Sequence, residues 1–460
     1  PKQHFGEAHR LAKLSGANIS LHGPVRGIDV GGFTQQGYSD TQRFQAENQI
    51  KSMLERAHEF DPKGNVPVVF HTTSGIPAFE LRKGHKIPEE EKKEWLKRKG
   101  KLDFPEEAFT GFAVNQESGQ LVPLKYEEKY HFGFNKDSEE GKSIYHPSKR
   151  LDSLNETEWD QEQLRVQSYQ EEMRRLHDRA LGLQKEYLPL AHGADKGVLN
   201  ENEKKQFIEL QREIKTIGNH IQNIKHISDS QLSEMWTKVE KYADPQDKKE
   251  FLEKSKELYD AANKTYKGLI DPADIQEAVK EGKINDEQAV VLLKERENQY
   301  FKLVTTAMGT MPTPKVYRPV NDFAKEKVSE TVSNAIYHAY DKFKENAPFL
   351  ALENYFPDLV LSNAEGLRDV VLESRKKLQE KLIKEKSISE QEAKRISEKL
   401  IGATWDTGHI NYLRRLGYSK EDVIKEAETI AKSKVVKHVH INDTFGFSDS
   451  HLPPGMGNAG

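Results

Sequence analysis

The chain has 460 residues, with 70 Lys and Arg against 74 Asp and Glu, which gives a formal net charge of −4 at pH 7. This balance excludes a uniformly basic nucleic-acid-binding protein, although it leaves room for a local basic patch. There is no cysteine, so disulfides, thiolate metal sites and cysteine nucleophiles are excluded, and any metal must be held by nitrogen and oxygen. No apolar run approaches the ~18–20 residues of a membrane span. With no recognisable signal peptide, we expect a cytoplasmic protein with no membrane partner.

Residues 1–78 alternate helix and strand signals. Helices are predicted over His4–Leu14 and Ser39–Glu59, and strands over Ala17–His22 and Val66–His71. Short apolar strands that alternate with longer amphipathic helices are typical of a parallel sheet.

Residues 79–321 interrupt this alternation and are predicted to form a mainly helical insertion. Ile87–Lys101 is a dense run of charges, and Phe112–Tyr126 is predicted to be a β-hairpin. Apolar residues then recur at a spacing of 3.5 over Val166–Leu190 and again over Phe207–Ile224. The two segments predict an antiparallel coiled-coil hairpin, and a dimer zipper is the alternative. Further helices are predicted over Gln231–Tyr242, Lys248–Leu269 and Asp286–Thr306.

Residues 322–460 return to the first pattern. Predicted helices cover Asp322–Asn346, Ala364–Leu400 and Lys420–Lys432, and predicted strands cover Phe349–Glu353, Ile401–Asp406 and Val435–Asn442. We therefore predict one α/β domain with five strands, built from residues 1–78 and 322–460 around the insertion.

Each predicted strand ends in a side chain that can bind a metal. The segments are Ser20–Pro24, Val68–Thr72, Leu352–Asn354, Thr404–His409 and His438–Thr444, and the last is followed by Ser448–Gly455. Active-site groups lie at the carboxyl ends of strands in parallel α/β folds. Imidazoles and carboxylates without sulfur suit zinc, manganese or a similar divalent ion.

Each motif also has a structural interpretation. A single histidine after a strand, such as His22 or His71, is often a hydrogen-bonding residue, and Glu353 could pair with a lysine or arginine. Asp406 begins an Asp-Thr-Gly-His sequence that also suits a helix start. His438 and His440 lie on one side of a strand, as metal ligands or as a core pair. The joint pattern over five strands favours a metal site.

The order His-Gly-Pro, strand-His, Leu-Glu-Asn, Asp-Thr-Gly-His, His-Ile-Asn-Asp and Asp-x-His resembles the endonuclease IV family of the xylose-isomerase-like TIM barrels. The resemblance covers roughly residues 1–78 and 322–460. It implies a TIM barrel that is incomplete at both ends, with strands missing before Pro1 and after Gly460. It also implies up to three zinc ions, with manganese or another divalent ion as the alternative. The implied ligands are His22, His71, Glu353, Asp406, His409, His440, Asp449 and His451.

Three functions remain open. The resemblance to endonuclease IV implies a zinc-dependent phosphodiesterase that cleaves damaged DNA at abasic sites, with Glu353 and Asp406 as the catalytic carboxylates. The segments His438–His440 and His451–Gly455 look closer to the sugar isomerase and epimerase branch, which implies one ion and a sugar or sugar phosphate substrate. A third possibility is a scaffold whose helical arm binds a protein partner or self-associates.

Overall fold

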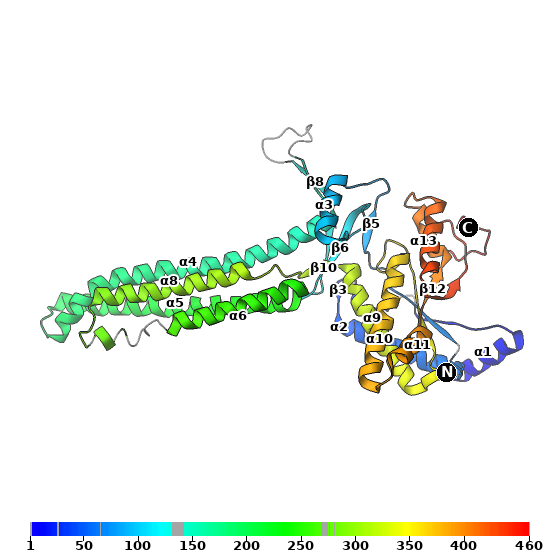
Figure 1. The fold of residues 1–460 in the computed structure, drawn as a ribbon, viewed down its shortest axis with the longest axis horizontal. Helices are drawn as coiled ribbons and strands as arrows, with labels where there is room; N and C mark the ends of the chain where they lie inside the picture. The colour runs from blue at the N-terminus through cyan, green and yellow to red at the C-terminus, as the bar shows by residue number, and fades with distance from the viewer. Residues whose placement is uncertain are drawn as a thin grey trace. The chain divides into compact units, whose positions relative to one another are not determined.

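The computed structural model describes residues 2–24, 27–64, 66–130, 142–267, 275, 277–279 and 281–459 (Figure 1). The chain divides into two compact units. Unit 1 comprises Pro1–Asp152 and Tyr317–Gly460, and unit 2 comprises Ser153–Val316. Residues 79–152 and 317–321 of the predicted insertion therefore group with unit 1.

Unit 1 is a mixed α/β fold around one parallel sheet of five strands, in the order β1-β4-β11-β12-β13. These strands are β1 (Leu21–His22), β4 (Pro67–His71), β11 (Phe349–Glu353), β12 (Ile401–Asp406) and β13 (Val436–His440). Each falls within one of the five predicted strands: β11 and β12 have the predicted bounds, whereas β1, β4 and β13 are shorter than predicted. The described residues form this open row of strands and do not show a complete TIM barrel.

Strand β1 is shorter than the predicted strand Ala17–His22. Its register pairs Leu21 with Val68 and His22 with Val69. Continuing that register would place Ser20 opposite Pro67, which has no backbone N–H to donate to the ladder. The pairing with β4 therefore begins only at Leu21.

Helices flank the sheet in unit 1, and α2, α9 and α10 pack against one another in turn. The helices of this unit are α1 (Lys2–Ser15), α2 (Asp40–Phe60), α3 (Glu89–Lys99), α9 (Val320–Phe343), α10 (Ala364–Lys386), α11 (Glu390–Leu400), α12 (Thr407–Ile410) and α13 (Lys420–Lys432), with 3-10 turns η1 (Lys344–Asn346) and η2 (Asn411–Arg414). The predicted helical stretch 364–400 is two helices because Ser387 adopts a left-handed conformation, with φ of 53°, and Ser389 caps α11.

A second, antiparallel sheet in unit 1 confirms the predicted hairpin, since β6 pairs with β7. It contains β5 (Phe79–Leu81), β6 (Ala108–Asn115), β7 (Leu121–Lys125) and β10 (Tyr317–Pro319), and two short ribbons pair β2 (Phe33–Thr34) with β3 (Gly37–Tyr38) and β8 (Glu127–Tyr130) with β9 (Lys142–Tyr145). The charge run contains α3.

Unit 2 is helical, and its helices are α4 (Pro147–Asp195, which begins in unit 1), α5 (Glu201–Tyr242), α6 (Pro245–Lys267) and α8 (Asp286–Thr310). Helices α4 and α5 run antiparallel, because Tyr187 stacks on Phe207 near one end and Glu162 pairs with Lys238 near the other. Val166 and Met173 of the apolar stripe are buried in clusters that also include residues of α8. The coiled-coil geometry of this hairpin remains a prediction.

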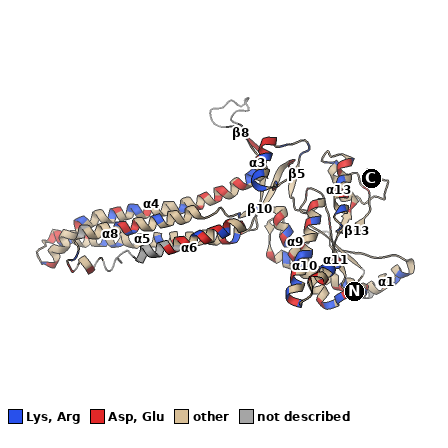
Figure 2. Ribbon diagram, viewed as in Figure 1, with Lys and Arg blue, Asp and Glu red and all other residues tan. Residues whose placement is uncertain are grey.

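Charges of both signs alternate along the helices of unit 2 (Figure 2), so their outer faces are those of solvated helices. Among the described helices of the chain, none is long and apolar enough to cross a membrane.

Candidate metal centre

The candidate site lies at the carboxyl ends of the five parallel strands. His22, His71, Glu353, Asp406 and His440 are the last residues of β1, β4, β11, β12 and β13, respectively. Register pairs Glu353 with His71 and Asp406 with His440 across neighbouring strands. Parallel strands in register bring their final side chains to one edge of the sheet, so the topology alone gathers these five groups.

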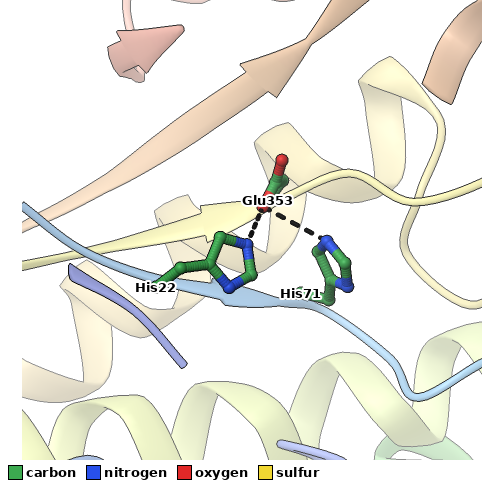
Figure 3. A group of neighbouring side chains, drawn as sticks. All are labelled: His22, His71 and Glu353. Carbon is green, nitrogen blue, oxygen red and sulfur yellow. Dashed lines mark hydrogen bonds and ion pairs between the residues drawn. The ribbon is translucent and has the colours of Figure 1, made fainter. Parts of the chain in front are cut away.

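Glu353 is the centre of this arrangement and is 1% exposed. Its Oε2 lies 2.8 Å from Nε2 of His22 and 3.3 Å from Nε2 of His71 (Figure 3). Its Oε1 lies 2.5 Å from Nδ1 of His440 and 4.0 Å from Nδ1 of His409. The two oxygens of one carboxylate therefore face two different sets of imidazoles. The partners in these contacts are all histidines, whereas the structural interpretation of Glu353 expects a lysine or arginine.

Asp406 is fully buried and acts at once as a helix cap and as part of the cluster. Its Oδ1 accepts hydrogen bonds from the backbone N–H groups of Gly408 and His409, each at 2.8 Å. Its Oδ2 accepts one from Nδ2 of Asn442 at 2.7 Å and lies 3.6 Å from Nδ1 of His440. The helix-start and the metal-ligand interpretations of the Asp-Thr-Gly-His sequence are thus compatible, because the capping hydrogen bonds orient the carboxylate of Asp406.

Two imidazoles are oriented by backbone carbonyls. Nδ1 of His22 lies 2.7 Å from the carbonyl oxygen of Gly23, and Nδ1 of His409 lies 2.9 Å from that of Asn354. Because a carbonyl oxygen only accepts, Nδ1 carries the proton in both rings, and Nε2 is left to face the cluster. This outer hydrogen bond is the arrangement that metal-binding histidines use.

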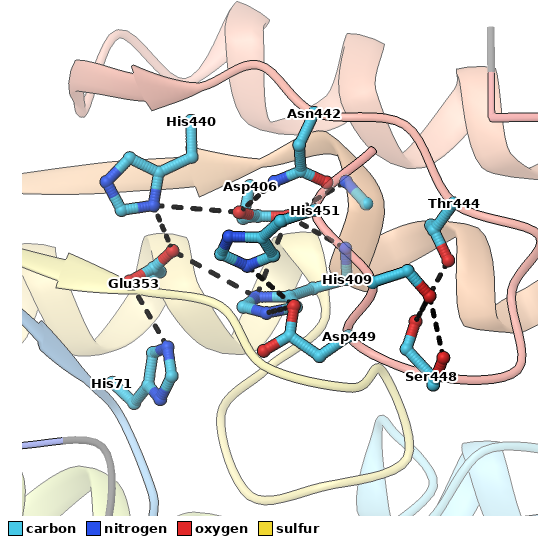
Figure 4. Close-up of polar contacts among 12 residues, drawn as sticks. His71, Glu353, Asp406, His409, His440, Asn442, Thr444, Ser448, Asp449 and His451 are labelled. Atoms are coloured by element: carbon cyan, nitrogen blue, oxygen red, sulfur yellow. Dashed lines mark hydrogen bonds and ion pairs between the residues drawn. The ribbon is translucent and has the colours of Figure 1, made fainter. Parts of the chain in front are cut away.

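The loop after β13 supplies the last two predicted residues. Oδ1 of Asp449 lies 3.2 Å from Nε2 of His409 and 2.6 Å from Nε2 of His451 (Figure 4). The side chains of Asp449 and His451 are 33% and 58% exposed, whereas His409 is 2% exposed. The loop ligands therefore form the solvent side of the site.

The structure brings all eight predicted site residues into one connected network of ion pairs. Within it, three groups have ligand atoms that lie within 4.8 Å of one another. These groups are His22, His71 and Glu353; Glu353, Asp406 and His440; and Asp406, His409 and His451. Glu353 and Asp406 each belong to two groups. The donor set, imidazole nitrogens and carboxylate oxygens, fits zinc or a similar divalent ion.

The same contacts shift the pKa values of the residues in the cluster. Burial disfavours the charged form of Glu353, but the imidazoles of His22, His440 and His71 outweigh it and hold its pKa far below the usual range. Asp406 and Glu353 raise the pKa of His440 to about 10. Hydrogen bonding to Glu353 likewise raises the pKa of His22. Without a cation, the protonated imidazole of His440 thus compensates its carboxylate partners Glu353 and Asp406.

Sequence reasoning missed three supporting residues. Asn354 is fully buried, and its side chain accepts from the N–H of Asp406 at 2.8 Å and donates to the carbonyl oxygen of Asp406 at 3.1 Å. Asn442 holds Asp406 as described above, and the ring of Tyr355 stacks on His71 with centroids 4.8 Å apart. The available signals were that Asn354 and Asn442 belong to the Leu-Glu-Asn and His-Ile-Asn-Asp motifs, and that Tyr355 lies two residues after Glu353.

His438, which the sequence left as a ligand or core residue, belongs to none of the three groups and lies 3.3 Å from Oγ1 of Thr404.

Comparisons of the chain with protein-family models, with curated proteins and with solved structures found no match.

Proposed function

We propose that this protein is a phosphodiesterase with a multinuclear divalent-metal centre, and that its substrate is DNA at abasic sites. The sharing of Glu353 and Asp406 between ligand groups supports this function most strongly. A carboxylate whose two oxygens face different imidazole sets could contribute to the binding of two cations. Eight candidate ligands also exceed what a single ion needs.

Charge favours the same substrate class. The cluster contains three carboxylates, Glu353, Asp406 and Asp449. One divalent cation would leave this set with an excess of negative charge, while two or three would make it positive. A positive centre attracts the anionic phosphate of a diester and stabilises the charge that develops on it.

When bound, clustered divalent cations lower the pKa of a water ligand towards neutrality and orient the phosphate oxygens for in-line attack. The protein's part is to fix its own donors. Asn354, Asn442 and the start of α12 lock Asp406, and the backbone carbonyls of Gly23 and Asn354 lock His22 and His409. The more exposed members are His22, His440, Asp449 and His451, with 33%, 24%, 33% and 58% of their side chains exposed. Substrate therefore approaches from their side.

The experiment is cleavage of a duplex that contains a single abasic site, by zinc-loaded and manganese-loaded protein. We expect strand scission next to the lesion, loss of activity with a chelator, and recovery when the metal is restored. Failure to cleave this duplex or any simple phosphodiester, with metal bound, would contradict the proposal.

A second function is favoured by one of the three groups. Glu353, Asp406 and His440 could hold a single ion without the others, as a sugar isomerase or epimerase requires, and a carboxylate would then move a proton between adjacent carbons. Incorporation of solvent deuterium into a ketose by the metal-loaded protein, without phosphodiester cleavage, would favour this alternative.

The helical arm of unit 2 gives the third function, a scaffold that binds a protein partner or self-associates. Removal of the arm, described in the Discussion, separates it from the two enzymatic functions.

A further inference from the structure

The loop 443–459 carries Asp449 and His451 to the cluster, and its anchor is the carboxylate of Asp443. Asp443 follows β13 by three residues and is 5% exposed. Its Oδ1 accepts hydrogen bonds from the backbone N–H groups of Thr444 at 2.8 Å and Ala459 at 2.9 Å. Its Oδ2 accepts from those of Gly455 at 3.0 Å and Gly457 at 2.8 Å.

Four backbone donors on one carboxylate tie both ends of the loop to a single point. Charge-assisted bonds of this kind are stronger than neutral ones, and they lower the pKa of Asp443. Both carboxylate oxygens are engaged, each with two donors. The carboxylate of Asp443 therefore binds backbone N–H groups of the loop rather than a cation.

Backbone bonds continue the anchor towards the ligands. Asp443 and Leu452 exchange two hydrogen bonds, at 2.7 and 2.8 Å, immediately after His451. Oγ1 of Thr444 donates to the carbonyl oxygen of Ser448 at 2.9 Å, immediately before Asp449. The segment between these two ties contains both loop ligands.

The conformation of His451 shows why an anchor is needed. Its φ is 46°, in the left-handed region that a side chain with a Cβ rarely adopts. Such a conformation persists only where surrounding contacts determine it. The exchange of bonds between Asp443 and Leu452 supplies that constraint next to His451.

We propose that Asp443 is a positioning residue that folds the loop 443–459 so that Asp449 and His451 complete the solvent side of the metal centre. The inference rests on the proposed function. It predicts a division of the centre: the group of Asp406, His409 and His451 depends on Asp443, whereas the group of His22, His71 and Glu353 does not, because every member of that group lies on a strand end.

The test compares Asp443→Asn with Asp422→Asn in the full chain. Asp422 is a matched control because its carboxylate also accepts a backbone N–H, that of Ser419 at 2.7 Å, but does so in the capping box at the start of α13. An asparagine at 443 keeps one oxygen and turns an NH₂ group towards backbone donors. Gly457→Ala is a second variant, since a Cβ there would lie 2.4 Å from Oδ1 of Asp443.

Zinc titrations with the metal alone should show that Asp443→Asn weakens the most loosely held ion by ~10–100-fold, the usual cost of losing an outer hydrogen bond at a metal site. The tighter ions should remain. His451→Asn should weaken the same ion, and adding Asp443→Asn to it should cost less than the product of the two separate effects, because the part of the loss that passes through His451 is shared. Unchanged affinity for every ion in Asp443→Asn, or loss of all ions together, would overturn the proposal.

Hydrogen exchange of the metal-free protein separates this inference from the proposed function. Exchange of the Gly455, Gly457 and Ala459 amides should accelerate at least tenfold in Asp443→Asn and stay unchanged in Asp422→Asn. If the wild-type chain binds no divalent ion, the proposed function fails. The exchange rates still show whether Asp443 holds the loop 443–459 in place. Unchanged exchange in the loop would refute the anchor even in a protein that binds metal.

Discussion

A buried carboxylate is costly unless other groups replace its lost hydration, and at Glu353 three imidazoles from different parts of the chain, those of His22, His71 and His440, do so. None of these partners is a lysine or arginine. A permanent cation would neutralise Glu353 irreversibly, whereas a histidine gives up its proton and lets a metal ion take its place. The choice of partner is what distinguishes a metal-competent carboxylate from a structural ion pair.

Replacing Glu353 tests this reading at the residue that two groups share. Glu353→Gln removes the negative charge from both, so we expect at least half of the bound metal to be lost. We expect phosphodiesterase activity to fall by more than ~100-fold, since even outer-shell changes cost ~10–100-fold. Metal analysis and initial rates measure both. The matched control is Glu55→Gln, which also removes a carboxylate that pairs with a histidine, His338 at 2.9 Å, but on the surface between α2 and α9; it should leave metal content unchanged.

Metal binding should also release protons. The pKa of His440 is raised to about 10, so this ring is protonated at pH 7 in the metal-free protein, and the pKa values of His22 and His409 are raised in the same direction. A histidine must be in its neutral form to bind a metal ion. Metal affinity should therefore increase with pH from about 6.5 up to about 10, roughly tenfold per pH unit for each proton released. Calorimetry in buffers of different ionisation enthalpy measures this number. Affinity that is independent of pH would show that protonated imidazoles are not displaced.

At the scale of the element, each strand contributes its last residue and little else to the site. β12 is buried along its whole length and ends in Asp406, where the chain turns directly into α12. The turn is tight because Gly408 lies against the side chain of Asn442: a Cβ at Gly408 would be 1.8 Å from Oδ1 of Asn442. Glycine at this position allows Asn442 to reach Asp406.

We therefore expect Gly408→Ala to push Asn442 away and to lower the free energy of unfolding by about 1–3 kcal/mol, the usual cost of overpacking. Urea denaturation of the metal-free variant measures it. Gly6→Ala is the control, because a Cβ there meets nothing within 4 Å and Gly6 lies inside α1; alanine should be neutral or stabilising by up to ~1 kcal/mol. Equal free energies of unfolding for the two variants would show that the close approach of Gly408 and Asn442 does not contribute to stability.

The elements themselves were largely predictable, and the reasons are local. β11, β12 and α13 begin and end at the predicted residues because an apolar run meets a polar ligand or a serine cap. β1 was predicted too long, because the missing N–H of its partner Pro67 is a property of the neighbouring strand. The structural roles of Asn354 and Asp443 could not be predicted from the sequence either. Their roles depend on backbone groups that approach only when distant segments are folded together.

At the scale of the whole molecule, every predicted ligand belongs to unit 1. The four long helices described in unit 2 contribute none of them, and their apolar stripes are directed to clusters among themselves, such as the one around Val166, Met235 and Val304. The metal centre should therefore be independent of the arm.

Replacing Ser153–Val316 with a short Gly-Ser linker tests this independence. We expect the shortened chain to bind the same number of zinc ions with affinities within about threefold of the full chain, as metal analysis and titration would show. Loss of metal from a shortened chain that still unfolds cooperatively would indicate that unit 2 supports the centre. If instead the arm binds a partner or mediates self-association, that property alone should disappear.

The central claim is that strand-end side chains and one loop form a single centre for several cations. The most direct measurement is the number of zinc ions bound per full-length chain at saturation, with their positions located by anomalous diffraction. We predict two or three ions, with Glu353 and Asp406 each contacting more than one. A saturated stoichiometry of one, or no bound zinc at all, would contradict the account.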